Sequence, residues 1–522
     1  MLWRVAHSRS SFKLYQSRWA NRLAIVRAMS TAAGHSNAEA GPSTLPSRFS
    51  LPAHISISNL EGRKELDKSL FDVRVKILTV RLEGPNVNRM ISNRLFRQHT
   101  LDIGRAKAII PDPSDRNCKL VRMKVSSEDE LPEDVRELIK SEANGTSTEE
   151  LVLGFDDWST SEILNSILPK DSNDEFAPSS FTLTGHIGHV NLKEEWLPYK
   201  YLIAQVMLHK NAALRTVVNK LDQINAAYRF FDMEVLAGEP DMLTTVSESG
   251  CSFTFDFSKV YWNSRLQHEH ERMIQSIQRG ETVADVMAGV GPFAVPLAKK
   301  GCYVLGNDLN PESVKWMRKN QENNKVQATL RVTESDGREF IKQSVMTFWN
   351  HPFEPYNPAP KNKDKSKRNR SAPGQPPGAT HPPSPTPPPV LKTLATPQVP
   401  QHFIMNLPDS ALTFLDAFWG LYAPLALEPG FEELVKSVGL PLVHVYCFTR
   451  ELDPAPAERD ICERASAVLA YTVEPSMADF KLHPVRRVAP KKDMYCLTFR
   501  LPAEVAFATG PYPGEASQQD AH

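Results

Sequence analysis

Short apolar runs alternate with amphipathic segments through the C-terminal half of the chain. Six of these runs predict strands, at residues 282–291, 302–310, 328–337, 402–408, 443–450 and 494–502. Helical patterns lie between them, at residues 311–325, 338–349 and 410–423. Strands that alternate with helices predict βαβ units and a doubly wound sheet with right-handed crossovers. We expect one such α/β domain over residues 257–508.

The pattern upstream of this domain is less regular. Strand-like segments occur at 73–82, 226–238 and 252–262, helical segments at 159–168 and 201–211, and a strand or turn at 185–192. This mixture predicts two smaller α+β modules, which we place at residues 50–135 and 140–256.

Length and charge limit the class of protein. The 522 residues correspond to about three domains. Lys plus Arg equals Asp plus Glu at 61 each, which excludes a histone-like binder of nucleic acid but not a local basic patch. No apolar run approaches the ~18 residues of a membrane span. The six cysteines form no CxxC pair, so we expect neither a disulfide scaffold nor a zinc module.

Three segments have compositions unlike those of a folded domain. Six Lys or Arg residues precede the first acidic residue, Glu39, which is typical of a mitochondrial presequence within a disordered leader over residues 1–45. A plain disordered leader is the alternative. Residues 352–400 hold 15 of the 41 prolines and predict a disordered insertion inside the α/β domain. Residues 509–522 predict a disordered tail.

A glycine-rich turn follows the first strand of the α/β domain. Gly289 and Gly291 come just after Asp285, where glycine lets the backbone approach a ligand. The turn has neither the third glycine of a dinucleotide fingerprint nor the Gly-Lys of a phosphate loop. Asp308 and Asp336 end the next two strands, and three acids in one crevice suit a positively charged nucleoside. We therefore predict S-adenosyl-L-methionine as the cofactor, although such a turn also occurs in other α/β domains.

Further along the chain, motifs recur in a specific order. They are GHIGHVNL, YRFFDMEVLAGE, FDFSKVYWNSRLQHEHER, DVMAGVGPF, NDLNP, SDGREF, NLP and VAPKKDMYC. Over residues 155–502 the chain resembles the eukaryotic and archaeal tRNA (guanine-37-N1)-methyltransferases. The resemblance implies a class I, Rossmann-like S-adenosylmethionine-dependent methyltransferase domain with two N-terminal modules that grip tRNA. It also implies methylation of N1 of guanosine 37, which supports reading-frame maintenance, in the mitochondrial matrix as well as cytoplasm and nucleus.

The resemblance assigns cofactor contacts and catalytic roles. The cofactor-binding residues we expect are Asp285, Ala288, Gly289, Gly291, Asp308, Leu309, Asp336, Gly337 and Asn406. Guanine N1 carries a proton at neutral pH, so its methylation needs a general base, and Glu269 matches the proton acceptor of the family. Arg229 matches an arginine that contacts the target base. Asn406 would accept a hydrogen bond from the guanine amino group, and Tyr261 would stack on the flipped base.

Each of these assignments has a structural alternative. Glu269 could be a solvated helix residue, Arg229 a strand residue with its head in solvent, and Asn406 a helix cap. Tyr261 could pack in the core.

We expect tRNA to be held by local contacts. The candidate RNA-binding residues are Arg229, Tyr261, Arg265, Arg487 and Lys491. The basic cluster near the C-terminus could also be a solvated run of charge; it consists of Arg486, Arg487, Lys491, Lys492 and Arg500. His186 and His189 have no cysteine partners, so we expect no metal, and nothing points to an obligate oligomer, so we expect a monomer. Two rival functions stay open: an aminocarboxypropyl transferase of the wybutosine pathway, and a non-catalytic tRNA-binding protein.

Overall fold

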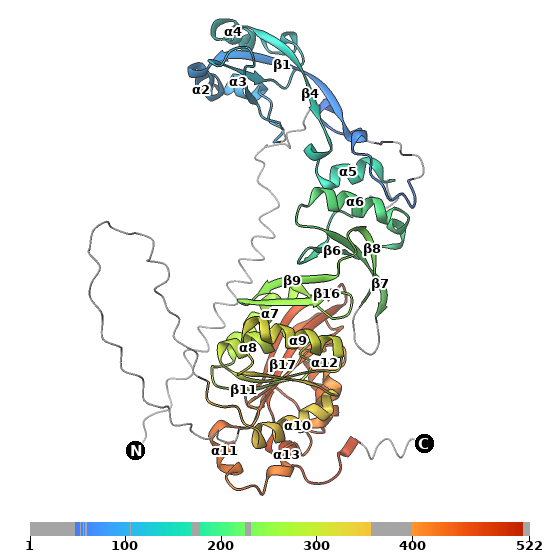
Figure 1. Ribbon diagram of the computed structural model, residues 1–522, viewed down its shortest axis with the longest axis vertical. Helices are drawn as coiled ribbons and strands as arrows, with labels where there is room; N and C mark the ends of the chain where they lie inside the picture. The colour runs from blue at the N-terminus through green and yellow to red at the C-terminus, as the bar shows by residue number, and fades with distance from the viewer. Residues whose placement is uncertain are drawn as a thin grey trace, which may run out of the picture. The chain divides into compact units, whose positions relative to one another are not determined.

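The computed structural model describes residues 47–514, apart from 53, 56, 58, 59, 105, 170–177, 225–230 and 357–397. The predicted presequence, Arg229, most of the predicted insertion and the end of the predicted tail lie outside the described residues. The described chain divides into two units (Figure 1). One contains Lys68–Ser166, and the other contains Ser56–Asp67 and the chain from Ile167 onward.

The first unit is built on an antiparallel sheet of strand order β2-β3-β1-β4. Its strands are β1 (Val73–Glu83), β2 (Ile109–Pro111), β3 (Cys118–Arg122) and β4 (Thr146–Leu153). Alternate residues of β1, namely Leu78, Val80 and Leu82, are buried against helices α2 (Gly84–Ser92), α3 (Arg94–His99) and α4 (Glu133–Glu142). Because β4 pairs along β1, the boundary predicted at residues 135–140 is too early.

The second unit begins with a smaller mixed sheet of order β5-β6-β7-β8. Its strands are β5 (Thr182–Thr184), β6 (Ile187–Val190), β7 (Thr216–Ile224) and β8 (Phe231–Gly238). Helix α6 (Lys200–Lys210) contacts β7 and β8 and buries Leu202, Ile203 and Val206. The helix predicted at 201–211 is therefore confirmed.

A seven-stranded sheet follows, of order β13-β12-β11-β14-β15-β17-β16. Its parallel strands are β11 (Thr282–Asp285), β12 (Tyr303–Asp308), β13 (Leu330–Glu334), β14 (His402–Met405) and β15 (Leu442–Thr449). At one edge, β17 (Lys492–Arg500) pairs antiparallel with β15, and β16 (Lys481–Ala489) pairs antiparallel with β17. The predicted doubly wound domain is confirmed. The strand order reverses between β11 and β14, and ligands bind at the carboxyl ends of strands at such a reversal.

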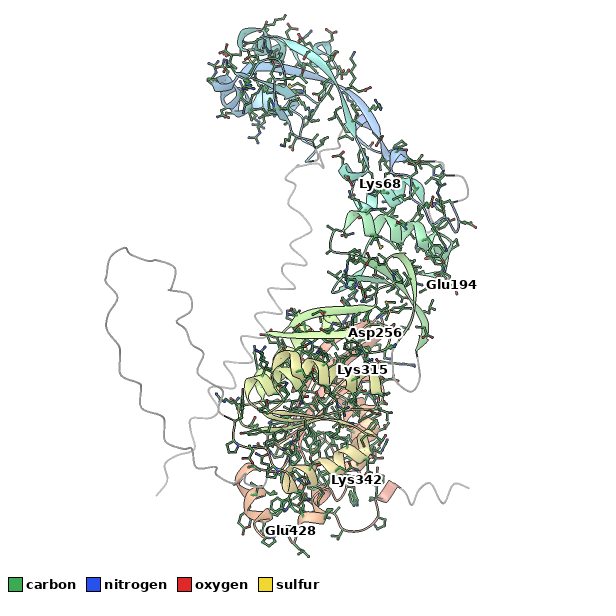
Figure 2. The ribbon with its side chains drawn as sticks, in the orientation of Figure 1. Lys68, Glu194, Asp256, Lys315, Lys342 and Glu428 are labelled. Atoms are coloured by element: carbon green, nitrogen blue, oxygen red, sulfur yellow. The ribbon has the colours of Figure 1, made fainter. Side chains whose placement is uncertain are left out.

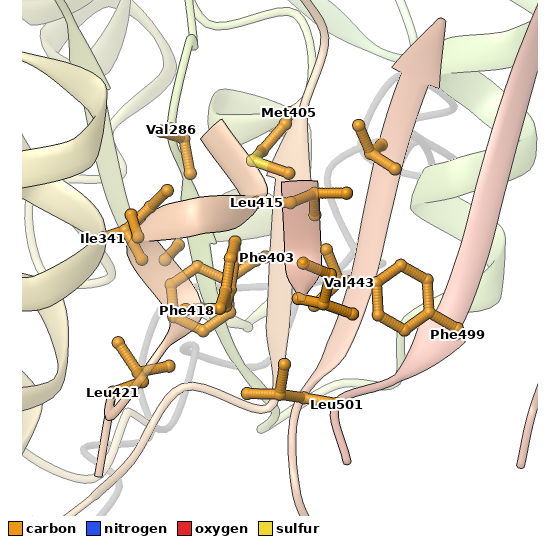
Figure 3. Packing of buried hydrophobic residues seen from close by; sticks show 14 of the residues in the cluster. Val286, Ile341, Phe403, Met405, Leu415, Phe418, Leu421, Val443, Phe499 and Leu501 are labelled. Atoms are coloured by element: carbon orange, nitrogen blue, oxygen red, sulfur yellow. The ribbon is translucent and has the colours of Figure 1, made fainter. Parts of the chain in front are cut away.

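Helices cover both faces of this sheet, because successive residues of each strand point to opposite sides. One face carries α10 (Gly337–Asn350), α11 (Phe431–Val438), α12 (Pro454–Leu469) and α13 (Ala503–Ala506). Phe403, Val443 and Phe499 lie in the core of that face (Figure 3). The other face carries α7 (Gln267–Ser276), α8 (Ala294–Lys300) and α9 (Pro311–Asn324). Charged side chains such as Lys315 of α9 face solvent (Figure 2).

A hairpin of β9 (Leu243–Glu248) and β10 (Cys251–Asp256) belongs to this domain as well. Its Phe253 and Phe255 are fully buried in the core shared with α8 and α9. The amides of Ser252 and Thr254 donate to the side chains of two asparagines on α9. The domain start predicted at residue 257 is therefore too late by the length of the hairpin.

The helix predicted at residues 410–423 is instead a 3-10 segment, Ala411–Phe418, followed by a turn. The backbone amides of Gly420 and Tyr422 donate to the carbonyls of Val505 and Ala506. These bonds to α13 replace the i to i−4 bonds that would continue an α-helix. A local sequence pattern cannot predict them, because they join segments that are far apart in the chain.

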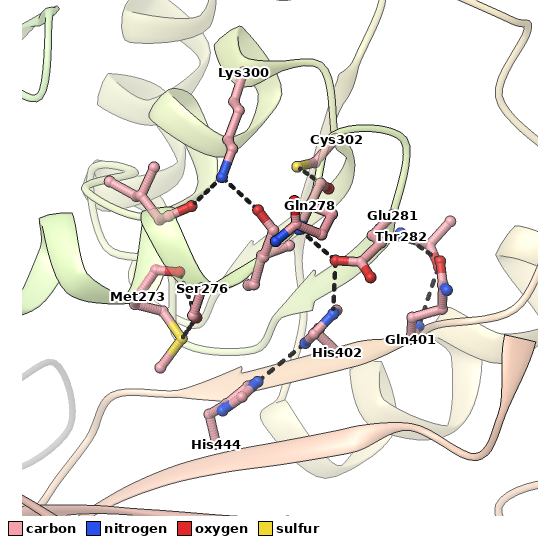
Figure 4. Close-up of polar contacts among 12 residues, drawn as sticks. Met273, Ser276, Gln278, Glu281, Thr282, Lys300, Cys302, Gln401, His402 and His444 are labelled. Atoms are coloured by element: carbon pink, nitrogen blue, oxygen red, sulfur yellow. Dashed lines mark hydrogen bonds and ion pairs between the residues drawn. The ribbon is translucent and has the colours of Figure 1, made fainter. Parts of the chain in front are cut away.

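Two histidines form a buried chain of hydrogen bonds near the amino ends of β14 and β15 (Figure 4). His402 Nε2 lies 3.2 Å from Glu281 Oε2, and His402 Nδ1 lies 3.1 Å from His444 Nε2. His444 Nδ1 lies 2.9 Å from the Thr498 hydroxyl. Burial lowers the pKa of His444 well below its usual range, and the neighbouring His402, Arg272 and Lys481 lower it further.

This arrangement predicts that the second unit loses stability in mild acid. Below about pH 6.5, the unfolded chain binds a proton at His444 that the folded chain does not, so the unfolding free energy falls by about 1.4 kcal/mol per pH unit. The slope should be smaller by that amount in His444→Gln, measured by urea unfolding between pH 7 and about pH 5. Equal slopes in the two proteins would show that His444 is not held neutral.

Candidate cofactor and substrate site

A cavity of about 420 Å³ opens at the carboxyl ends of β11, β12 and β14, where the strand order reverses. This volume lies in the range of about 300–1,000 Å³ that is usual for small-molecule sites. Seven of the nine predicted cofactor-binding residues line the cavity: Ala288, Gly289, Asp308, Leu309, Asp336, Gly337 and Asn406. The other two, Asp285 and Gly291, lie outside the lining.

The glycine turn takes a backbone shape that excludes most other residues. Gly289 and Gly291 have φ values of +57° and +95°, in the left-handed region. A Cβ on Gly291 would lie 2.7 Å from a methyl group of Val295. The Gly289 amide donates to Asp308 Oδ2 at 2.8 Å, so the acid that ends β12 also fixes the turn after β11.

Acidic side chains lie at the carboxyl ends of β11 and β12, close to the glycine turn. Asp285 is fully buried and ends β11. Burial raises the pKa of Asp285 well above its usual range, and the nearby Asp308 raises it further, against a smaller opposing effect of the Ala294 amide. Burial likewise raises the pKa of Asp308, while the amides of Asn310 and Gly289 oppose the rise. Cationic ligands relieve such crowding of carboxylates.

These residues fit S-adenosyl-L-methionine. Both carboxylate oxygens of Asp285, and the amide oxygen of Asn406, are buried with no hydrogen-bond partner in the described part of the chain. Buried acceptors without a partner are uncommon, and Asn406, unlike Asp285, lines the cavity, where a bound ligand can reach it. Leu309, which is 51% exposed, offers an apolar surface beside Asp308 that suits a flat base. The acids match the sulfonium and ammonium charges of this cofactor.

A second set of side chains lines the rest of the cavity. Asn406 and Pro408 follow β14, and Phe448 lies near the end of β15. Tyr261, 45% exposed, stands at the rim, where its ring is open to a partner. Burial of the hydroxyl raises the pKa of Tyr261, against opposing effects of Asn263 and Arg486. An open aromatic ring and an unpaired amide are what a flipped base requires.

Glu269 does not lie on the cavity wall. It is 6% exposed, and its carboxylate accepts hydrogen bonds from Arg272 Nε at 2.7 Å and Arg272 Nη2 at 2.6 Å. The Tyr446 hydroxyl also donates to it, at 2.7 Å. Burial raises the pKa of Tyr446 well above its usual range, and Cys496 and Glu269 add to the rise. The hydroxyl therefore keeps its proton and remains a donor to Glu269.

The next residue, His270, is the one that lines the cavity. Its Nδ1 is hydrogen-bonded to the carboxylate of Glu248 on β9. Its ring packs edge-on against Phe293, which also lines the cavity, at 4.8 Å between centroids. His270 was not among the residues predicted from the sequence, although it lies inside the motif FDFSKVYWNSRLQHEHER.

The remaining RNA-binding candidates do not line the cavity. Arg265 is exposed and donates to the Thr182 hydroxyl on β5 at 2.9 Å. Arg487 is paired with Asp493 at 3.1 Å across the β16–β17 hairpin. Lys491 is exposed at the turn of that hairpin. Arg229 lies outside the described residues.

Within residues 47–514, outside the gaps, no group of three or more His, Cys, Asp or Glu side chains could hold a metal ion. The helices of this part of the chain are each too short or too polar to cross a lipid bilayer.

Comparison with known proteins gives consistent relatives. The model of the TRM5/TYW2 methyltransferase domain matches residues 244–348, and that of the TYW2 N-terminal domain matches residues 160–241. A tRNA (guanine(37)-N(1))-methyltransferase of Cryptococcus neoformans is 49% identical, covering 85% of this chain and 87% of its own. One of Coprinopsis cinerea is 46% identical, covering 85% and 95%. A solved complex of aTrm5 and tRNALeu has a TM-score of 0.51 at 17% identity, covering 82% of this chain and 100% of that one, and shows the same fold.

Proposed function

The chain belongs to the tRNA (guanine(37)-N(1))-methyltransferase family, and we propose that it transfers the methyl group of S-adenosyl-L-methionine to N1 of guanosine 37 in tRNA. The observation that supports this most is the single cavity that is lined by acidic residues and also by Asn406 and Tyr261. The acids suit a cationic cofactor, and Asn406 and Tyr261 suit a flipped base.

When bound, S-adenosyl-L-methionine would supply an electrophilic methyl group. The chain supplies position and proton transfer. Asp308 fixes the glycine turn, and the fully buried Asp285 ends the strand that precedes it. Asn406 accepts a hydrogen bond from the guanine amino group, and Tyr261 stacks on the ring.

We propose that Glu269 accepts the proton that guanine N1 loses. This assignment rests on the resemblance to the family. The assignment requires the carboxylate to leave Arg272 and Tyr446 when tRNA binds, because it lies behind the cavity wall. His270 occupies the wall beside it and is the alternative acceptor, with Glu248 fixing its tautomer.

We assign the contacts with the rest of the tRNA to Arg229, Arg265, Arg487 and Lys491. The last three have exposed side chains, and phosphate contacts should make affinity fall with salt. Arg229 is assigned on the resemblance alone. We also propose that the protein acts as a monomer.

The reaction is tested with cofactor labelled at two positions. The protein is incubated with tRNA and with S-adenosylmethionine carrying its label either in the methyl group or in the carboxyl group. Methyl label alone should enter the tRNA. Entry of the carboxyl label would show transfer of the aminocarboxypropyl group instead, and no label at all would favour a binding protein.

We propose that residues 1–45 direct part of the protein to the mitochondrial matrix, while the rest acts in the cytoplasm and nucleus. Their six basic and no acidic residues before Glu39 support this. A fluorescent reporter fused to these residues should enter mitochondria, and a reporter that stays wholly cytosolic would rule the targeting out.

A further inference from the structure

One cation stands at the cavity. Among the described residues that line it, Lys492 is the only lysine or arginine. Its ammonium lies 4.1 Å from the centroid of the Phe448 ring and 3.7 Å from Asp409 Oδ1, and both of these residues also line the cavity. The aromatic face and the carboxylate together hold the charge at the wall.

The topology separates this cation from the acidic end. Lys492 is the first residue of β17, and the next residue, Asp493, pairs with Thr449 at the carboxyl end of β15. Four strand spacings lie between β12, which ends at Asp308, and β17. At about 4.8 Å per spacing, the backbones of these two strands lie about 19 Å apart across the sheet. Lys492 therefore faces the end of the cavity that carries Asn406.

A cation repels a sulfonium, and an oxygen acceptor such as the carbonyl oxygen O6 of guanine suits it better. When N1 of guanine loses its proton, negative charge develops on the carbonyl oxygen O6. A fixed ammonium in a partly desolvated cavity stabilises such a charge, as oxyanion-hole donors do. O6 can accept two hydrogen bonds, so this contact is compatible with one from Arg229.

We propose that Lys492 donates a hydrogen bond to guanine O6 and stabilises the charge that forms there during methyl transfer. This inference rests on the proposed function. Lys492 keeps its proton throughout, and the N1 proton goes to the acceptor on α7. Neither the family motifs nor the cofactor pattern singled this residue out from its neighbour Lys491.

The test measures single-turnover methylation at saturating tRNA and cofactor. Lys492→Met should lower the rate by about 10²-fold, as loss of one oxyanion donor does. The dissociation constant for tRNA and its salt dependence should change little. Lys492→Arg keeps the charge and should recover part of the rate. This recovery would show that the loss in Lys492→Met comes from the missing charge and not from a disturbed fold. Lys481→Met, at the far end of the same hairpin, removes an equal charge and should keep the wild-type rate.

A tRNA with 6-thioguanosine at position 37 isolates the contact, because sulfur is a weak hydrogen-bond acceptor. The wild type should slow on this substrate, and Lys492→Met should show little further loss. Full additivity of the two changes would overturn the proposal. So would a normal rate with weaker tRNA binding and a salt slope lower by about one, which would mark a phosphate contact. A wild type that does not methylate guanosine 37 at all would refute the proposed function instead.

Discussion

Glu269→Gln should lower the single-turnover rate of methyl transfer by about 10³-fold, within the range of general base catalysis. A glutamine amide cannot take the proton that guanine N1 must lose. The affinities for tRNA and for S-adenosylmethionine should stay near those of the wild type, because Glu269 lines neither end of the cavity. Rapid-quench kinetics with saturating substrates measure the chemical step separately from binding.

Glu271→Gln is the matched control. Glu271 lies two residues along the same helix, and its carboxylate accepts a hydrogen bond from Gln275 on the exposed surface. This variant should keep the wild-type rate. Comparison with His270→Gln completes the set: a wild-type rate in Glu269→Gln together with a large loss in His270→Gln would move the proton acceptor to His270.

The hydrogen bonds from Arg272 and Tyr446 to Glu269 allow a check on folding. Glutamine retains an oxygen that can accept from Arg272 or Tyr446, and Arg272 is one-third exposed, so water screens its charge. The melting temperature of Glu269→Gln should therefore stay close to that of the wild type. A large drop would mean that the lost rate reflects unfolding.

Asn406→Ala should lower kcat/KM for tRNA by roughly ten- to a hundredfold. The amide oxygen of Asn406 is buried without a partner among the described residues, so it is free to accept from the guanine amino group. Loss of one partner of a buried hydrogen bond costs about 1–3 kcal/mol, and each 1.4 kcal/mol is about a factor of ten.

A tRNA with inosine at position 37 tests this contact directly, since inosine lacks only the amino group. The wild type should discriminate against inosine by a factor similar to the Asn406→Ala loss, and the variant should hardly discriminate. If the variant still prefers guanosine as strongly as the wild type does, Asn406 has another role, such as capping the segment after β14.

The cofactor end of the site was predictable from the sequence because its residues are tied to strand ends. A short apolar run fixes where a strand stops, and parallel strands bring Asp285, Asp308 and Asp336 to one edge of the sheet. The rules on crossovers restrict the possible strand orders. The acids therefore come together whatever the details of packing are.

The part of the site around His270 and Lys492 was less predictable, because the positions of these side chains depend on how the helices and strands pack. Neighbouring helix residues point about 100° apart, so the motif could not show that His270 and not Glu269 faces the cavity. Strand β16 was missed because Pro484 and several basic residues interrupt its apolar alternation, which is typical of an edge strand. The place of Lys492 depends on the antiparallel pairing of β17 with β15, which the apolar pattern does not specify.

The central claim is methylation of N1 of guanosine 37, and one assay tests it most directly. Purified protein is incubated with S-adenosyl-L-methionine and an unmodified tRNA transcript that has guanosine at position 37, and the nucleosides are analysed by mass spectrometry. We predict 1-methylguanosine, and its loss when adenosine replaces guanosine at that position. A heavier adduct, a methyl group elsewhere, or no product would contradict the account.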